Sequence, residues 1–424
     1  MAKVYHSEIF GLREAKYDWL NKHDINNIKW KKVFPRPEFY LFIPTNDKLA
    51  NHYYSFNKIT EIFPVNSVGI VTARDALTIG WSKKEIWERV KNFARLEPEL
   101  ARQTYKLGND ARDWKVELAQ KDLKDSGLDD DKIVQIYYRP FDIRWTYYTG
   151  HSRGFHCMPR GEVMNNMLLE NIALITSRMT KGEIFHHAQI TKKITEVICM
   201  SPKTSNNGFV FPLYLYPEKK EKRKSIPIQM VMFEPETKYQ VRQPNINDQL
   251  TKDLRENFKK GISPEEIFYY IYAILYSNIY RLKYSEFLKR DFPRIPFTKN
   301  YKLFIKLGKL GKELAELHTL ESSELNETIT FIAVNGNNKV EKLIYEDEKV
   351  WINKEQYFDN VKDEVWQYQI GGYQVCEKWL KDRKGRTLTL DEIKTYCKIV
   401  TALSKTIELQ NEIDKYYDDV ENTI

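Results

Sequence analysis

Residues 263–297 carry the strongest helix signal in the chain. Ser263 is a suitable N-cap, and Glu266, three residues later, completes a capping box with it. Pro264 fits the first helical position, where its missing N–H is not needed. The apolar residues then recur at the i, i+3, i+4, i+7 and i+8 positions of a core-facing helix: Ile267, Tyr270, Ile271, Ile274 and Leu275.

A second helical run follows the polar break at Ser277–Asn278 and carries a basic face that ends at Lys289-Arg290. Pro293 and Pro296 stop this run, because proline cannot continue a helix. We expect the first helix to lie in the core. The second helix and its exit, KRDFPRIPF, should form a basic edge against a β scaffold.

The charge of the chain is concentrated rather than evenly spread. The formal net charge of the 424 residues is +8, and the stretch from Arg281 to Lys312 alone carries ten basic and two acidic residues. This clustering favours a polyanionic partner. The four cysteines show no CxxC spacing, and no apolar run approaches the roughly 18 residues needed to span a membrane. We therefore expect a cytoplasmic protein without a disulfide framework.

The order of helical and β-rich stretches predicts an α+β fold, in which a mixed β-rich recognition domain has helical bundle elements before and after it. Residues 1–130 form a helical and extended linker-like segment. The central domain spans 131–335, with a β scaffold at 131–216 and helices at 248–320. Residues 336–424 should add a hairpin and C-terminal helices that pack on the central domain.

Runs of β-forming residues bounded by turn signals predict the strands of the scaffold: Val68–Thr72, Ile133–Phe141, Ile143–Tyr148, Ile172–Ser177, Ile194–Met200 and Phe209–Tyr216. A further hairpin is expected between Thr328–Val334 and Val340–Tyr345 across Asn335-Gly336. Apolar periodicity and caps predict the remaining helices: Glu14–Leu20, Ser82–Phe93, Glu162–Leu169, Tyr373–Leu380 and Leu390–Ile413.

Catalytic motifs are missing from the sequence. There is no GxSxG elbow, no phosphate-binding glycine loop, and no (D/N)PP(Y/F/W) loop; Arg294-Ile295-Pro296-Phe297 is only its nearest match. Glu346-Asp347-Glu348-Lys349 could imitate a nuclease core, but an exposed hairpin tip explains it better. His151, His156, His186 and His187 lie close in sequence without a carboxylate or thiol at matching spacing, so no metal site and no cofactor site is predicted.

Basic and polar residues interleave with strands and turns between residues 150 and 207. Arg and Lys can contact guanine edges, Asn and Gln can contact adenine, and hydroxyls can contact phosphates. Loops on a rigid β scaffold can present such groups to a DNA groove. The candidate DNA-binding residues are Arg153, Arg160, Arg178, Lys181, Lys192, Lys193, Lys203, Thr204, Asn206 and Asn207, and Lys289, Arg290 and Arg294 are expected as phosphate-side support.

Several strings together resemble one protein family. They are YRPFDIRW at 138–145, FPLYLY at 211–216, YR at 280–281 through KRDFPRIP at 289–296, and GYQV with KWL at 372–380. Their order is similar to that of the C-terminal part of type ISP and related type IIG restriction–modification enzymes. YHSEIFGLREAKYDWL and SVGIVTARD, within residues 1–100, look like the segment that joins the methyltransferase domain of that family to its target recognition domain.

The resemblance implies a target recognition domain that reads double-stranded DNA for an N6-adenine methyltransferase of bacterial defence. S-adenosylmethionine would bind in the methyltransferase domain, which is missing from this chain together with the helicase and nuclease motifs. The chain would then be a C-terminal fragment or a split specificity subunit. We interpret Arg139, Asp142 and Arg144 as a buried structural arrangement with aromatic packing.

Two other readings stay open from the sequence. The chain could retain S-adenosylmethionine-dependent methyltransferase or nuclease activity, for which tritiated methyl transfer to DNA is the discriminating assay. It could also be a structural coupler that binds other subunits through helices 373–380 and 390–413. Intramolecular packing of their apolar faces is the favoured alternative to coupling.

Overall fold

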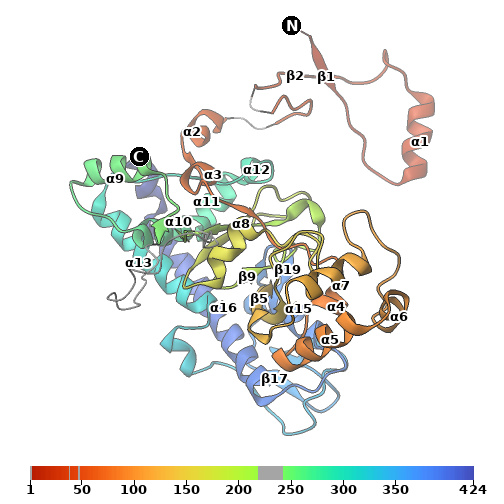
Figure 1. The fold of residues 1–424 in the computed structure, drawn as a ribbon. Coiled ribbons are helices and arrows are strands. Elements are labelled where there is room, and N and C mark those ends of the chain that lie inside the picture. Colours follow the sequence, from red (N-terminus) through yellow and green to blue (C-terminus); the bar gives the residue numbers. More distant parts are fainter. Residues whose placement is uncertain (1, 38, 46–47, 218–241) are drawn as a thin grey trace, which may run out of the picture. The chain divides into compact units, whose positions relative to one another are not determined.

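The structure is a computed structural model that describes residues 2–37, 39–45, 48–217 and 242–424. The basic run Lys219–Lys224 therefore lies outside the described residues. Residue contacts divide the chain into two compact units, Met1–Tyr53 and Tyr54–Ile424 (Figure 1). The domain boundaries expected from the sequence stay a prediction.

The first unit is small and has little buried surface. Strand β1 (Val4–His6) pairs antiparallel with β2 (Lys31–Val33), and α1 (Arg13–Lys22) lies between them in sequence. Helix α1 confirms the helix expected at 14–20, yet it buries none of its residues. Helix α2 (Ala50–Tyr54) falls at the division between the units.

The second unit contains several small sheets surrounded by helices, which confirms the expected α+β class (Figure 1). The first sheet is antiparallel, in the order β4 (Ser67–Val68), β10 (Gly208–Pro212), β7 (Ala173–Ser177) and β8 (Ala188–Thr191). The second contains β6 (Asp142–Tyr147), β5 (Ile133–Arg139) and β9 (Ile194–Thr195). Two-stranded pairs join β11 (Tyr214–Leu215) to β12 (Gln243–Pro244) and β3 (Asn57–Lys58) to β13 (Arg294–Ile295).

Strands β5 and β6 form the hairpin that the YRPFDIRW string occupies. Their register joins Ile133 to Tyr147 and Arg139 to Asp142. Phe141 takes a positive φ of 59° at the turn. The break expected between the two strands is confirmed. The strands expected at 68–72 and 194–200 are shorter than predicted, because beyond β4 and β9 the chain forms only isolated bridges: Ile70 bonds to Thr195 and Val197, whereas Val71 bonds to Met158.

Short helices before the hairpin form a separate small core. They are α4 (Asp75–Thr78), α5 (Lys83–Arg95), α6 (Pro98–Thr104) and α7 (Val116–Asp125), whereas α3 (Ile59–Ile62) lies outside this core. Ser82 accepts a hydrogen bond from the Glu85 amide, so the predicted cap of α5 is confirmed. Ile86, Val90 and Phe93 on the predicted face are fully buried. Helix α8 (Gly161–Met164) follows the hairpin, where a short helix was expected.

The expected core helix is α10 (Pro264–Tyr276), and its capping box between Ser263 and Glu266 is present. The break at Ser277 is also confirmed, because its hydroxyl caps the next helix. The neighbouring helices are α9 (Asp248–Phe258), α11 (Asn278–Lys283), α12 (Ser285–Leu288) and α13 (Tyr301–His318).

Helices α10 and α13 pack closely because α13 has glycine at the contact. A Cβ atom added at Gly311 would lie 1.9 Å from the Tyr269 carbonyl oxygen of α10. A Cβ at Gly308, one turn earlier, would lie at an ordinary 3.5 Å from the Glu266 carbonyl oxygen. The two glycines therefore differ in how much space surrounds them.

Gly311→Ala is expected to lower the free energy of unfolding by about 1–3 kcal/mol, because the two backbones must separate to admit the methyl group. Gly308→Ala is the matched control. It should leave stability unchanged or raise it by up to about 1 kcal/mol, since alanine favours the helix. Urea unfolding of both variants checks this prediction, and equal stability of the two variants would contradict it.

A buried polar network joins α10, α13 and the long C-terminal helix α16 (Leu390–Asn422). The imidazole of His318 contacts the Tyr272 hydroxyl through Nδ1 and the Thr406 hydroxyl, 2.9 Å away, through Nε2. Tyr272 also donates to Gln189 of β8 at 3.0 Å. Burial, assisted by nearby Arg281, lowers the pKa of His318 to about 3, so the ring is neutral in the fold.

Acid should therefore weaken the fold through His318. Below about pH 6.5 the unfolded chain binds a proton that the folded ring excludes, so the free energy of unfolding falls as the pH falls. The contribution of His318 is up to about 1.4 kcal/mol per pH unit between its unfolded and folded pKa values. Urea unfolding at pH 6.5 and 5.5 should show a shallower pH dependence for His318→Gln than for the natural chain. Identical slopes would contradict the buried neutral ring.

The hairpin expected across Asn335-Gly336 is wrong. Strand β14 (Phe331–Ile332) pairs instead with β17 (Tyr357–Asp359) in a four-stranded sheet. The reason is the buried Gln356, which donates to the Val334 carbonyl at 2.9 Å and accepts from the Asn338 amide at 2.7 Å. The side-chain amide of Gln356 therefore makes hydrogen bonds to the backbone of residues 334–338, where a tight turn was expected.

The other strands of this sheet form a hairpin further along the chain. Strand β15 (Ile344–Glu346) pairs with β16 (Lys349–Trp351), and both tip residues, Asp347 and Glu348, have positive φ. The run 346–349 is thus an exposed hairpin tip, as predicted. Positive φ at both central residues matches the favoured two-residue hairpin turns.

The C-terminal helices pack within the chain. Strands β18 (Gln369–Ile370) and β19 (Tyr373–Gln374) form a tight turn before α15 (Val375–Lys381), and α14 (Asp363–Trp366) precedes them. The apolar face of α16 is buried, as the intramolecular alternative predicted: Ile393, Cys397, Val400 and Leu403. Within the described part of the chain, no helix is both long and apolar enough to cross a membrane.

Candidate functional site

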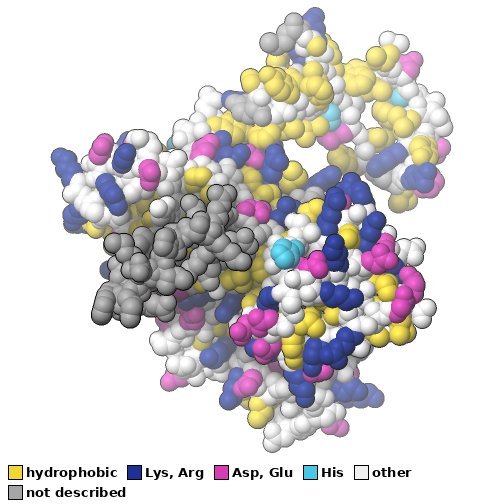
Figure 2. Space-filling model, viewed as in Figure 1, with side chains coloured by type: hydrophobic (Ala, Val, Ile, Leu, Met, Phe, Trp, Pro, Cys, Tyr) yellow, Lys and Arg dark blue, Asp and Glu magenta, His cyan; other side chains and the backbone are white. Residues whose placement is uncertain are grey.

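The candidate DNA-binding residues lie in several separate groups. On the face shown in Figure 2, Lys and Arg side chains are interspersed with Asp and Glu. Strand β7 separates two groups of candidates, because its Ser177 end pairs with Gly208 and its Ala173 end pairs with Thr191. These ends are roughly 13 Å apart.

The group at the Ser177 end lies on three loops that meet. We define the three-loop cluster as residues 178–187, 201–207 and the turn 370–373. It contains six of the ten candidates: Arg178, Lys181, Lys203, Thr204, Asn206 and Asn207. Arg178, Lys181, Lys203 and Thr204 are exposed, whereas Asn206 is fully buried.

The carboxylate of Glu183 holds the three-loop cluster together. It accepts hydrogen bonds from His187 Nε2 at 2.9 Å, Asn206 Nδ2 at 2.6 Å and Ser201 Oγ at 2.9 Å. The third loop closes on the same group, since a Cβ added at Gly372 would lie 2.5 Å from Glu183 Oε1. One side chain therefore fixes loops that are far apart in sequence.

The ionisation of Glu183 follows from these donors. Burial alone would raise the pKa of Glu183, but the hydrogen bonds from His187, Asn206 and Ser201 outweigh burial and lower the pKa to about 2. Burial lowers the pKa of His187, and its contact with Glu183 opposes that effect. Glu183 is thus a fixed anion at neutral pH.

Asn206 is a structural part of the cluster. Its Oδ1 accepts from the Lys181 backbone amide at 2.9 Å, and its Nδ2 donates to Glu183. This arrangement leaves the exposed side chains of Lys181, Lys203 and Thr204 on a backbone that is held from inside. Lys203 Nζ also donates to the Gly182 carbonyl at 2.8 Å.

A second carboxylate holds another candidate loop. Asp122, at the end of α7, accepts from Thr149 Oγ1 and from the Phe155 amide, each at 2.8 Å, and contacts His151 Nδ1 at 2.7 Å. The loop carries Arg153, whose side chain is 68% exposed. Arg160, at the end of this loop, is only half-buried, and both arginines have positive φ.

The remaining candidates lie elsewhere. Lys192 pairs with Glu321 at 2.5 Å at the other end of the first sheet, beside Lys193. Lys289 pairs with Glu286 at 2.8 Å. Arg290 contacts the same carboxylate at 3.6 Å, and Arg294 donates to the Phe56 carbonyl at 3.0 Å. Arg294 therefore anchors the β3–β13 pair.

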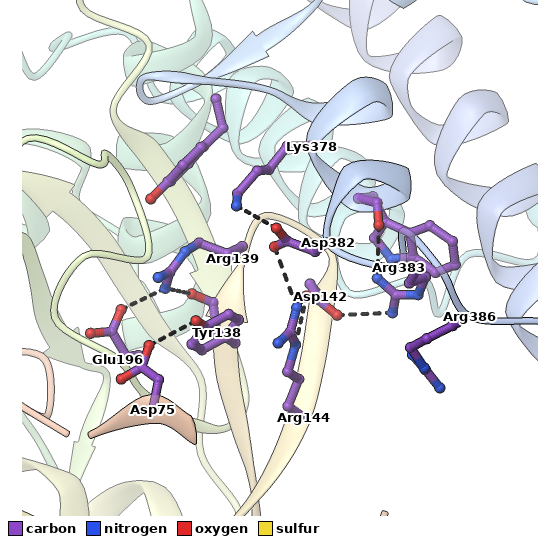
Figure 3. Close-up of polar contacts among 12 residues, drawn as sticks. Asp75, Tyr138, Arg139, Asp142, Arg144, Glu196, Lys378, Asp382, Arg383 and Arg386 are labelled. Atoms are coloured by element: carbon purple, nitrogen blue, oxygen red, sulfur yellow. Dashed lines mark hydrogen bonds and ion pairs between the residues drawn. The ribbon is translucent and has the colours of Figure 1, made fainter. Parts of the chain in front are cut away.

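The YRPFDIRW string forms buried ion pairs, as interpreted from the sequence (Figure 3). Arg139 contacts Glu196 at 2.6 Å. Asp142, 1% exposed, contacts Arg144 at 2.7 Å and Arg383 at 2.9 Å. Burial would raise the pKa of Asp142, but the two guanidinium groups hold it below its usual value.

Aromatic packing completes this arrangement. Arg144 and Arg386 lie over the Trp81 ring, with centroid distances of 3.9 and 3.8 Å. Arg144 also contacts Asp382, which in turn pairs with Lys378 of α15 (Figure 3). The network thus fastens the β5–β6 hairpin to α15, and its role is structural.

Three of the four histidines contact different residues. His151 contacts Asp122, His156 contacts Thr146 at 2.8 Å, and His187 contacts Glu183. Among the described residues, the one group of metal-type ligands is the exposed run Asp129, Asp130 and Asp131, which contains no histidine.

Fold and candidate site together define a mixed α+β domain that presents polar and basic loops at the edges of small sheets. The model of the Type ISP C-terminal specificity domain matches residues 61–412, and the chain belongs to this family. The resemblance stated from the residue strings is confirmed. Comparison with curated proteins gave no match.

Three solved structures share the fold. A nuclease-deletion mutant of the Type ISP restriction–modification enzyme LlaGI, in complex with a DNA substrate mimic, matches 97% of this chain with a TM-score of 0.67 and 19% identity. The DrdV–DNA complex matches 94% with a TM-score of 0.70 and 18% identity. The ATP-dependent Type ISP enzyme LlaBIII bound to DNA matches 91%, with a TM-score of 0.65 and 17% identity.

The chain is much shorter than these relatives. It covers 33% of the LlaGI chain, 42% of the DrdV chain and 25% of the LlaBIII chain.

The exposed basic residues were predicted from the sequence, but the acidic residues that fix their loops were not. Glu183, Asp122 and Glu196 were not singled out. An acidic residue inside a basic stretch was the available signal for Glu183. No such signal marked Arg383, which lies 241 residues from Asp142.

Proposed function

We propose that this chain recognises a specific double-stranded DNA sequence for a restriction–modification enzyme. The observation that carries this proposal is the match to the specificity-domain family over residues 61–412. The DNA complexes among the solved structures of the same fold support it.

We place the recognition surface at the three-loop cluster. Exposed Lys181 and Lys203 supply positive charge for phosphates, and Thr204 supplies a hydroxyl. The loops are already held by Glu183 and Asn206, so little conformational entropy is lost when DNA binds. The Asp122-held loop with Arg153 is a second contact to DNA in this proposal.

The catalytic parts belong to partners in our proposal. A methyltransferase domain, in the same longer chain or in a separate subunit, would modify adenine at N6 with S-adenosylmethionine. Helicase and nuclease domains would also lie in the same longer chain or in a separate subunit. The relatives of the same fold are longer chains, which supports such partners. This chain contributes recognition, works in the cytoplasm, and has no catalytic role of its own.

Selection from a random duplex library tests the proposal. The purified chain is mixed with the library, bound duplexes are recovered and amplified, and the enriched population is sequenced over several rounds. We expect one consensus sequence to emerge. Enrichment without any consensus, together with an affinity that ignores salt, would overturn the proposal.

Lys181→Gln should reduce the dependence of DNA affinity on salt. Each phosphate that a protein neutralises releases counterions and contributes about 0.9 to the slope of log affinity against log salt. Loss of one such contact should lower the slope by about one and weaken binding to all sequences alike. The matched control is Lys192→Gln at the opposite end of β7, which should keep the natural slope. The reverse result would place the DNA at the Lys192 end.

A further inference from the structure

Ile184 is an exposed apolar side chain inside the three-loop cluster. It is 68% exposed, although its neighbour Phe185 is 2% exposed and His187 is fully buried. The loop therefore buries the Phe185 side chain and leaves the Ile184 side chain in solvent.

The backbone around Ile184 is fixed on both sides. The Glu183 amide donates to the Thr180 carbonyl at 3.1 Å, and the Gly371 amide donates to the His186 carbonyl at 2.8 Å. The Glu183 carboxylate is held by three further donors. A β-branched side chain is stiff at χ1, so Ile184 projects in a defined direction.

The loops around Ile184 carry exposed basic side chains, two of which also have acidic partners: Lys203 Nζ lies 3.5 Å from Glu183 Oε1, and Arg178 Nε lies 3.5 Å from Asp291 Oδ1. Lys181 lies three residues before it, and Lys203 Nζ bonds to the Gly182 carbonyl two residues before it. Arg178 continues the same loop and is also exposed. Where these cations contact phosphates, as proposed above, an apolar group on the same loops would face the base edges rather than the backbone.

The major groove offers one apolar feature to such a side chain, the C5-methyl group of thymine. We propose that Ile184 is a base-reading residue that contacts a thymine methyl group in the target sequence. This inference rests on the proposed DNA recognition, and it names a specificity-determining residue for that function.

Replacing thymine with deoxyuridine in the selected duplex tests this inference, because the substitution removes only the methyl group. Each thymine of the consensus is replaced in turn, and the dissociation constant is measured for the natural chain and for Ile184→Ala. At one position we expect the natural chain to bind about fourfold more weakly without the methyl group, as the burial of one methyl group predicts. Ile184→Ala should bind both duplexes equally at that position.

The matched controls are two exposed leucines outside the three-loop cluster. Leu282 on α11 is 80% exposed and Leu390 at the start of α16 is 72% exposed. Leu282→Ala and Leu390→Ala should keep the full preference for thymine. Ile184→Val, which retains a branched side chain, should keep part of it, and thermal unfolding verifies that each variant is folded.

The outcomes separate the two proposals. Failure to select any consensus overturns DNA recognition and the inference with it. Three results would overturn only the role of Ile184. The consensus could contain no thymine, or deoxyuridine could leave the dissociation constant of the natural chain unchanged at every position. Deoxyuridine could also weaken binding by Ile184→Ala as much as it weakens binding by the natural chain.

Discussion

Replacing Asp142 with alanine is expected to lower the free energy of unfolding by about 3–5 kcal/mol. The carboxylate is 1% exposed and pairs with both Arg144 and Arg383. Without it, two guanidinium groups of low exposure would lose their shared partner. Urea unfolding followed by circular dichroism measures the change.

The control for Asp142 is an exposed carboxylate. Glu88 pairs with Lys91 on the surface of α5, and its side chain is 62% exposed. Glu88→Ala should leave stability unchanged, because surface ion pairs contribute little. If Asp142→Ala were as stable as Glu88→Ala, the network of Figure 3 would not fasten the hairpin to α15.

Glu183→Ala is expected to remove most of the sequence preference of the chain. His187, Ser201 and Asn206 would lose their common acceptor, so the loops that carry Lys181 and Lys203 would no longer be held in one arrangement. We expect the ratio of the dissociation constants for a permuted and a selected duplex to fall by about tenfold or more, since loop ordering must then occur on binding. Fluorescence anisotropy with the two duplexes measures this ratio.

Glu321→Ala is the control for Glu183→Ala. Glu321 pairs with Lys192 at the other end of β7, outside the three-loop cluster. The ratio should stay at its natural value in this variant. An unchanged ratio in Glu183→Ala, with the fold intact, would show that the cluster does not set the preference.

The helix caps, helix breaks and tight hairpins that depend on local interactions were predicted correctly from the sequence. The capping box at Ser263 and the break at Ser277 depend on residues within one turn, and both are present. The β5–β6 hairpin and the hairpin tip at 346–349 also depend on neighbouring residues.

The sequence could not predict what distant side chains decide. Gln356 replaces the expected turn at Asn335-Gly336 by bonding to residues about twenty positions away. Glu183 joins Ser201 and Asn206, which follow it by 18 and 23 residues. No periodicity or cap marks such contacts, because they exist only once the strands have paired.

The candidate site was predicted in part for the same reason. Composition placed the cations between residues 150 and 207, but strand register separates Lys192 and Lys193 from Lys181 and Lys203. Asn206 has the side-chain chemistry of a base reader, yet its amide group is used inside the fold.

In our proposal this chain alone distinguishes one DNA sequence from others. The most direct test is the equilibrium affinity of the isolated chain for the selected duplex and for a duplex of the same composition with the target permuted, both at physiological salt. We predict that the selected duplex binds about a thousandfold more tightly or better, as specific DNA-binding proteins do. Equal affinity for the two duplexes would contradict the claim.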